Sequence, residues 1–240
     1  MKNKIYNLLI IFILTISIIT KLNSEEIFNF NVSELEVTEE GNLFRGYNGG
    51  EAYTDDGISI KAENFEYDKT TNILIANKDV KFKDQNKNLI IIANEILYEK
   101  NKEKVIATGK VSIIDSSQNL NLKANKIIYS NTENLIKASN NVELNDKNKN
   151  IKIIANEILY LKDENKIFAN SNVELNDLDK NIKLKTDEIT YLKYQNIFFT
   201  KGITLAEIDS KYKIESKNIF FEKDKMRLYS SEKTVIKELE

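Results

Sequence analysis

Residues 151–161 read Ile-Lys-Ile-Ile-Ala-Asn-Glu-Ile-Leu-Tyr-Leu, and the spacing of their apolar side chains decides the fold. Ile151, Ile153 and Ala155 recur at every second position, which is the period of a half-buried β-strand. From Ala155 to Ile158 the step is three, so the apolar side chains change faces there. A β-bulge or a sharp bend is the simplest cause of such a change. The stretch therefore predicts a strand that bends near its middle.

The hexapeptide that holds this step is repeated along the chain. Its copies begin at Ala62, Ala93, Ala124, Ala155, Thr186 and Ser216. Successive copies start 31 residues apart, except the last, which starts after 30. A second apolar block follows in the same register, beginning at Ala76, Ala107, Ala138, Ala169 and Phe199. Polar turns separate the blocks, so each repeat predicts two strands, giving about eleven strands in all, with two or three more expected from residues 28–56.

The composition indicates a globular protein without catalytic chemistry. Of 240 residues, 41% are hydrophobic and 30% charged, and the chain has no Cys, His or Pro. The usual nucleophilic and transition-metal-binding side chains are therefore missing, and no disulfide can form. The adjacent carboxylates Asp55–Asp56 and Glu39–Glu40 lie beside glycine and read as solvated turns. We expect no enzyme activity, no catalytic residue, no metal and no cofactor.

The amino terminus has the order of a secretory signal peptide. Met-Lys-Asn-Lys is followed by a nearly apolar stretch over residues 5–20 and by Ser24, after which we expect cleavage. This predicts a signal peptide at 1–24, a single β domain at 25–240, and a periplasmic location, with outer-membrane association open. Leu22 is larger than the residue usual at that position, so a retained single-span anchor is the alternative. With a net charge of −2, nucleic acid is not an expected partner.

The repeated pattern, in which Ala-x-x-apolar-x-Tyr precedes Ala-x-Gly-x-Val-x-apolar, is most complete in Ala107-Thr-Gly-Lys-Val-Ser-Ile113. It resembles the lipopolysaccharide-transport (organic solvent tolerance) family over residues 28–239. Within that family it is similar to the periplasmic bridge protein and to the N-terminal domain of the lipopolysaccharide-assembly outer-membrane protein. Asn42-Leu-Phe-Arg-Gly46 makes the second likeness the greater. Whether the chain is complete or the leading part of a longer assembly protein stays open.

This chain departs from the family at the glycine of the second block. Lys78, Asn140 and Ser171 replace it in three of the copies. The likeness implies an all-β fold, an elongated antiparallel β-jelly roll in the form of an open, V-shaped two-sheet stack. It also implies a function, which is to bind and transport lipopolysaccharide or a related glycolipid and to shield the lipid A acyl chains in an apolar groove.

The residues themselves show regular apolar columns, which could line that groove or fill a closed core. As implied by the likeness, the groove residues are Ile60, Phe65, Tyr67, Val80, Phe82, Ile91, Ile96, Tyr98, Val111, Ile113, Leu122, Ile127, Tyr129, Val142, Leu144, Ile153, Ile158, Tyr160, Val173, Leu175, Leu184, Ile189, Tyr191, Ile203 and Leu205. Polar turns such as 162–165 are expected to be exposed.

The two ends of such a sheet stack carry unpaired backbone groups. Other lipopolysaccharide-transport proteins, or a second copy of this chain, could add a strand there. The expected docking residues are Phe28, Phe30, Val32, Leu35, Val37, Val235 and Leu239. Ordinary edge strands protected by their charged residues are the alternative.

Two other readings of the repeat remain. A β-solenoid surface protein or adhesin would stack the copies, and Asn94, Asn125 and Asn156 form the kind of column that it uses. Strand direction separates the two architectures, because a solenoid is parallel and a jelly roll antiparallel. A membrane-anchored inner-membrane component of the same transport system would keep the fold and retain residues 5–20.

Overall fold

The computed structural model describes residues 28–239, so the expected signal peptide at 1–24 lies outside the described residues. Within 28–239, none of the helices has the length and apolar character needed to span a membrane. The described part forms 18 strands and two short 3-10 helices, Glu39–Gly41 and Lys100–Lys102. The strands are β1 (Asn29–Thr38), β2 (Leu43–Tyr53), β3 (Ile58–Ala62), β4 (Asn64–Asp68), β5 (Ile73–Asp84), β6 (Leu89–Glu99), β7 (Lys104–Asp115), β8 (Leu120–Ser130), β9 (Leu135–Asp146), β10 (Ile151–Leu161), β11 (Lys166–Asp177), β12 (Ile182–Leu192), β13 (Ile197–Lys201), β14 (Ile203–Ile208), β15 (Tyr212–Lys217), β16 (Phe220–Glu222), β17 (Arg227–Tyr229) and β18 (Val235–Glu238).

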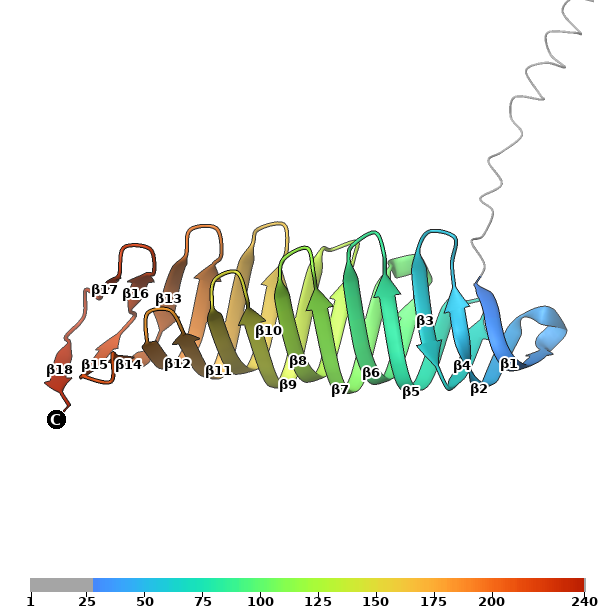
Figure 1. Cartoon of the computed structure of the whole chain (residues 1–240), viewed down its shortest axis with the longest axis horizontal. Coiled ribbons are helices and arrows are strands. Elements are labelled where there is room, and N and C mark those ends of the chain that lie inside the picture. Colours follow the sequence, from blue (N-terminus) through green and yellow to red (C-terminus); the bar gives the residue numbers. More distant parts are fainter. Residues whose placement is uncertain (1–27, 240) are drawn as a thin grey trace, which may run out of the picture.

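All the strands belong to one sheet, and every pairing is antiparallel. The long strands β5 to β12 follow one another in chain order, so that the sheet extends as a rod with β1 at one end and β18 at the other (Figure 1). Antiparallel pairing throughout residues 28–239 excludes the solenoid architecture. The all-β, elongated antiparallel fold that the family likeness implied is confirmed.

Each long strand bends near its middle, so that its two halves lie in facing layers. In β10 the pairing with β11 shifts register between Ile154 and Glu157, at the step of three in the sequence. We call this row of bends the crease. The halves of β12 pair with different strands, Ile182–Lys185 with β14 and Glu188–Leu192 with β13, which defines a β14 layer and a β13 layer. The predicted bend is therefore confirmed, and it folds one sheet into two layers (Figure 1).

The second block of each repeat also bends, which its even spacing does not reveal. In β11 the register shifts between Asn170 and Val173, where Ser171 and Asn172 have φ of 64° and 55°. Two consecutive left-handed residues turn the chain while keeping the inward side chains an even number of positions apart. Consecutive positive φ angles also occur at 78–79, 109–110 and 140–141.

Several bent strands are interrupted at the crease, which explains why there are more strands than the repeats predict. β3 and β4 are separated by Glu63, and β13 and β14 by Gly202, which has a φ of 91°. β15 and β16 are separated by residues 218–219, and β17 and β18 by residues 230–234. Each of these pairs corresponds to one bent strand of the central repeats.

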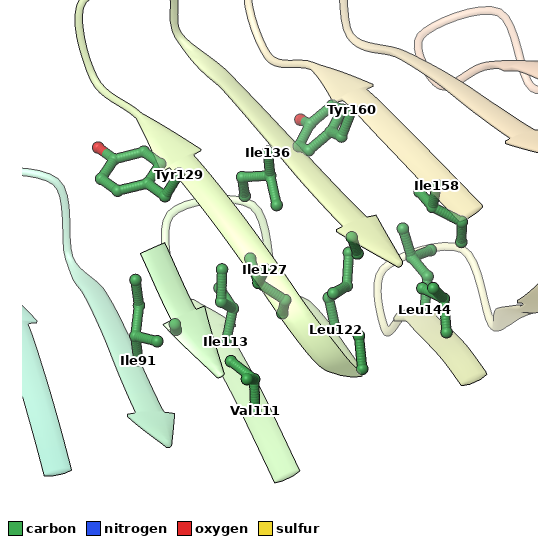
Figure 2. Close-up of a cluster of buried hydrophobic side chains, with 14 of the residues drawn as sticks. Ile91, Val111, Ile113, Leu122, Ile127, Tyr129, Ile136, Leu144, Ile158 and Tyr160 are labelled. Carbon is green, nitrogen blue, oxygen red and sulfur yellow. The ribbon is translucent and has the colours of Figure 1, made fainter. Parts of the chain in front are cut away.

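The space between the layers is filled by apolar side chains from both of them. In Figure 2, Ile113 and Leu122 of the β14 layer lie near Ile127 and Ile136 of the β13 layer. All four are fully buried. Because each strand supplies inward side chains from both halves, the core runs along the rod as one continuous column. Burial of this kind stabilises by roughly 25 cal/mol per Å² of apolar surface.

Candidate functional site

The candidate site is the apolar interior between the two layers. All but two of the residues expected to line a groove are buried there, with exposed fractions of 0–4%. Ile153, Ile158 and Val173 are typical, with exposures of 0%, 1% and 2%. The structure therefore brings the predicted columns together between the layers as closely packed side chains. Lipid binding by these residues stays a prediction.

Ile203 and Leu205 are the two exceptions, because the structure places them on the outer face. They are 57% and 51% exposed, whereas their neighbours Thr204 and Ala206 point inward and are 0% and 2% exposed. Spacing of the apolar residues favoured Ile203 as the equivalent of Val173, at an interval of 30. The structure keeps the interval of 31, which makes Thr204 the equivalent residue. The assignment of Ile203 and Leu205 to the interior was wrong by one position.

Three buried threonines explain how a polar residue can occupy those inward positions. The Thr204 hydroxyl donates to Oγ1 of Thr200 at 2.6 Å and lies 3.1 Å from Oγ1 of Thr186. Thr200 Oγ1 in turn accepts the backbone N–H of Ile219 at 2.8 Å. Hydroxyls that bond to one another can be buried at little cost. Hydrophobicity alone could not identify this cluster.

A column of tyrosines lies along the side of the interior that is opposite the crease. It consists of Tyr67, Tyr98, Tyr129, Tyr160 and Tyr191, each of which is 0–4% exposed. Burial raises the pKa of the last four above the usual tyrosine value. These hydroxyls therefore stay protonated at neutral pH. Their rings are apolar on the inside and present a polar tip toward the turns.

Ion pairs join the two layers along this side, which we call the mouth. A lysine at the start of a β13-layer turn reaches an aspartate at the end of a β14-layer strand. The Nζ–Oδ distances are 2.9 Å for Lys162–Asp115, 3.2 Å for Lys193–Asp146 and 2.6 Å for Lys223–Asp177. These lysine side chains are 7–10% exposed and the aspartates 0%. Lys162 is therefore mostly covered in this contact and is not the exposed turn residue expected from the sequence.

Each aspartate of this ladder also closes the turn that follows its strand. Oδ1 of Asp115 accepts the backbone N–H of Gln118 at 3.1 Å, and Oδ1 of Asp146 accepts that of Lys149 at 3.2 Å. One carboxylate thus accepts a hydrogen bond within its own turn and forms an ion pair with a lysine of the opposite layer. Removing one partner of a buried ion pair costs about 3–5 kcal/mol, since the remaining charge stays buried. The sequence interpretation missed this ladder, although the lysines and aspartates recur with the repeat.

The predicted docking residues at the first edge differ in exposure. Phe28 is 3% exposed and covers the end of the interior, with its ring 5.2 Å from that of Tyr67 and 6.1 Å from that of Tyr98. Phe30 and Val32 are partly buried against the core. Leu35 and Val37, each 47% exposed, face solvent on β1, which pairs only with β2 among the described strands. The free edge therefore offers Leu35 and Val37 and not Phe28.

The other end of the rod opens into two separate edges. β13, β16 and β17 continue one layer, and β14, β15 and β18 continue the other. Val235 and Ile236 on β18 are 44% and 63% exposed, and Leu239 is half-buried. Leu205, Ile214 and Val235 line an outer hollow of about 330 Å³, together with lysines from the neighbouring strands. Ile236 belongs to this exposed edge but was not identified from the sequence.

The acidic pairs considered in the sequence lie in turns. Asp55 and Asp56 are exposed, and Asp56 accepts a hydrogen bond from the Thr54 hydroxyl. Glu39 and Glu40 are exposed in the first 3-10 helix. Within residues 28–239, no group of three or more carboxylates is placed to hold a metal ion.

Comparison with known proteins finds similarity among solved structures. No protein-family profile and no curated protein sequence matches the chain. A solved structure similar to this chain is that of LptH from Pseudomonas aeruginosa, described as the LptA-homologous periplasmic component of the lipopolysaccharide transport device. The two are 15% identical, and the similarity has a TM-score of 0.44 and covers 48% of this chain and 83% of that chain.

Proposed function

We propose that this chain is a periplasmic carrier of lipopolysaccharide or a related glycolipid and that it receives acyl chains between its two layers. The observation that carries the proposal is the continuous apolar interior, which runs along the rod with the crease on one side and the mouth on the other. Along the mouth, the layers are held together by side-chain contacts and not by a shared strand. An acyl chain in the interior gains about 0.8 kcal/mol per buried CH₂ group.

The interior is packed, so an acyl chain enters only where the layers move apart. The end of the rod near β18 supports such movement. Past β12, the strands β13, β16 and β17 pair with one another, and β14, β15 and β18 likewise, so no pairing among the described strands joins the two groups. Large apolar side chains are also exposed at this end, among them Ile203, Leu205 and Ile236. Lipid contacts would replace side-chain contacts between layers, which keeps the net cost of opening small.

The free edges support docking to other transport proteins or to a second copy of the chain. β1 at one end and β17 and β18 at the other each pair on one side only among the described strands. An added strand would satisfy their backbone groups and continue the interior into the next molecule. The expected leader peptide at 1–24 would bring the protein into the periplasm.

Photo-crosslinking at two adjacent residues tests lipid carriage. Ile153 is 0% exposed and points into the interior, whereas Ile154 is 37% exposed on the outer face of the same strand. A photoreactive amino acid at each position should give lipopolysaccharide adducts in cells for position 153 only. Equal adducts at both positions, or adducts only at 154, would contradict the carrier function.

A structural rod is the second candidate, and the closeness of the interior packing favours it. Side chains such as Ile91, Ile113 and Leu144 are 0% exposed, as in an ordinary closed core. In that case position 153 would give no lipid adduct while the protein stays folded and exported. Amino-terminal sequencing of the exported protein separates a cleaved leader from a retained anchor.

A further inference from the structure

One position of the ion-pair ladder has its aspartate but not its lysine. The repeat period of 31 residues makes Asp84 the equivalent of Asp115, and Asn131 the equivalent of Lys162. Asp84 is 5% exposed, and its Oδ1 accepts the backbone N–H of Lys87 at 3.0 Å, as in the other turns of this row. Within residues 28–239, Asp84 makes no ion pair.

A cavity lies in the mouth where that lysine would be. Its volume is about 190 Å³, and its lining includes Asp84, Asn131, Phe82, Val105 and Tyr98. Phe82 and Val105 are each 1% exposed and belong to the interior, so the cavity leads from solvent to the core. At the equivalent positions further along the rod, a lysine side chain reaches the aspartate.

Asp84 and Tyr98, which both line this cavity, lack within the described part of the chain the partners that Asp115 and Tyr129 have one repeat further along. Tyr98 is 4% exposed, and its hydroxyl makes no hydrogen bond within residues 28–239, whereas the Tyr129 hydroxyl donates to Asn131 at 3.3 Å. Burial raises the pKa of Asp84, although the backbone N–H and the charge of Lys87 act in the opposite direction. Asp56 and Glu103 add two further carboxylates to the lining, against the single cation Lys87.

We infer that the mouth at Asp84 and Tyr98 binds a primary ammonium group carried on a short aliphatic chain. The ammonium would donate to the Asp84 carboxylate, as a lysine does at the other aspartates of the ladder. It would also donate to the Tyr98 hydroxyl oxygen. Its aliphatic chain would lie against Phe82 and Val105.

The lysines of the ladder show how such a chain would lie. Nζ of Lys162 is 5.9 Å from the centre of the Tyr129 ring, and Nζ of Lys193 is 5.4 Å from that of Tyr160. Tyr98 is the equivalent ring at the cavity. A cation close to an aromatic face gains further electrostatic stabilisation, so the site combines a carboxylate, a hydroxyl and an aromatic ring. This inference does not depend on lipid carriage.

The test is a titration of the whole exported chain with n-hexylammonium chloride, followed by the NMR signal of the Lys87 amide that bonds to Asp84. We expect a saturable shift, and about tenfold or more weaker binding of n-hexanol, which has the same chain without the charge. Absence of a saturable shift, or equal affinities for the amine and the alcohol, would overturn the inference.

Variants of the site make the result specific. Asn131→Lys supplies the missing ammonium from within the chain and should abolish binding of n-hexylammonium. Asp84→Asn keeps an oxygen for the Lys87 amide but removes the charge, and should weaken binding by about tenfold or more. Glu133→Gln makes the same change of net charge as Asn131→Lys at an exposed position of the same turn and should bind as the unaltered protein does. Unchanged binding in both site variants would overturn the assignment.

Discussion

Replacing Lys193 with methionine removes one ion pair of the mouth while keeping most of the side-chain volume. The Lys193 side chain is 8% exposed, and its Nζ lies 3.2 Å from Oδ2 of Asp146, which is fully buried. The substitution leaves the Asp146 carboxylate buried without its cation. A loss of this kind costs about 3–5 kcal/mol in the free energy of unfolding. For a chain of this size, that corresponds to a fall in Tm of roughly 6–20 °C.

The matched control is Lys152→Met, which removes an ion pair on the outer face. Nζ of Lys152 lies 2.9 Å from Oε2 of Glu143, and the two side chains are 32% and 34% exposed. Solvent screens this shorter pair, so its loss should cost about 0–1 kcal/mol. The contrast separates burial from distance as the origin of the effect.

Urea denaturation followed by circular dichroism, with calorimetry for Tm, measures both variants. The double variant Lys193→Met, Asp146→Asn should recover part of the lost stability, because its amide oxygen can still accept the Lys149 N–H and no charge is left buried. If Lys193→Met destabilises no more than Lys152→Met, the ion pairs do not hold the layers together.

Three further predictions concern the core, the crease and the mouth. Ile153→Ala should cost about 2–5 kcal/mol in urea denaturation, whereas Ile154→Ala on the outer face should cost less than about 1 kcal/mol. Gly109→Ala should lower the unfolding free energy by about 1–2 kcal/mol, because φ is +77° and a Cβ there would lie 2.8 Å from Nδ2 of Asn94. An unchanged unfolding free energy would show that the backbone at the crease adjusts to the added methyl group. Burial raises the pKa of Asp84, so its ionisation lowers the stability of the fold as pH rises above the usual aspartate value. Asp84→Asn should therefore stabilise at pH 7 but not near about pH 3, which urea denaturation at the two pH values measures.

The repeated step of three was sufficient to predict the bent strands and the two-strand repeat. Apolar spacing carries that information because the side chains on both sides of a bend must point into the same interior. The second bend escaped detection, since the left-handed residues at Ser171 and Asn172 leave the spacing even. Ile203 was misplaced for a related reason, because Thr204 occupies the inward position and is recognisable only by its hydrogen bonds.

The ion pairs of the mouth were harder to predict from the sequence. The lysine and the aspartate of each pair are distant in sequence, and both residue types are common in turns. Lys193 and Asp146 each resemble an ordinary solvated turn residue, and only the pairing of the two layers brings them together. A signal was nevertheless present, since both residue types recur with the 31-residue period. Charged residues that keep a repeat period are therefore candidates for contacts between distant turns. Whether the interior opens depends on the energies of two packed arrangements, about which spacing carries no information.

The 31-residue period also makes the length of the rod a quantity that can change only in fixed steps. Each repeat contributes two strands, and neighbouring strands are about 4.8 Å apart, so one repeat advances the rod by roughly 10 Å. Loss or gain of a whole repeat would leave every lysine of the mouth opposite an aspartate. Loss or gain of a single strand would instead exchange the turns of the β13 layer with those of the β14 layer. Gene duplication in units of 31 codons could thus lengthen or shorten the span of this protein without redesigning its core.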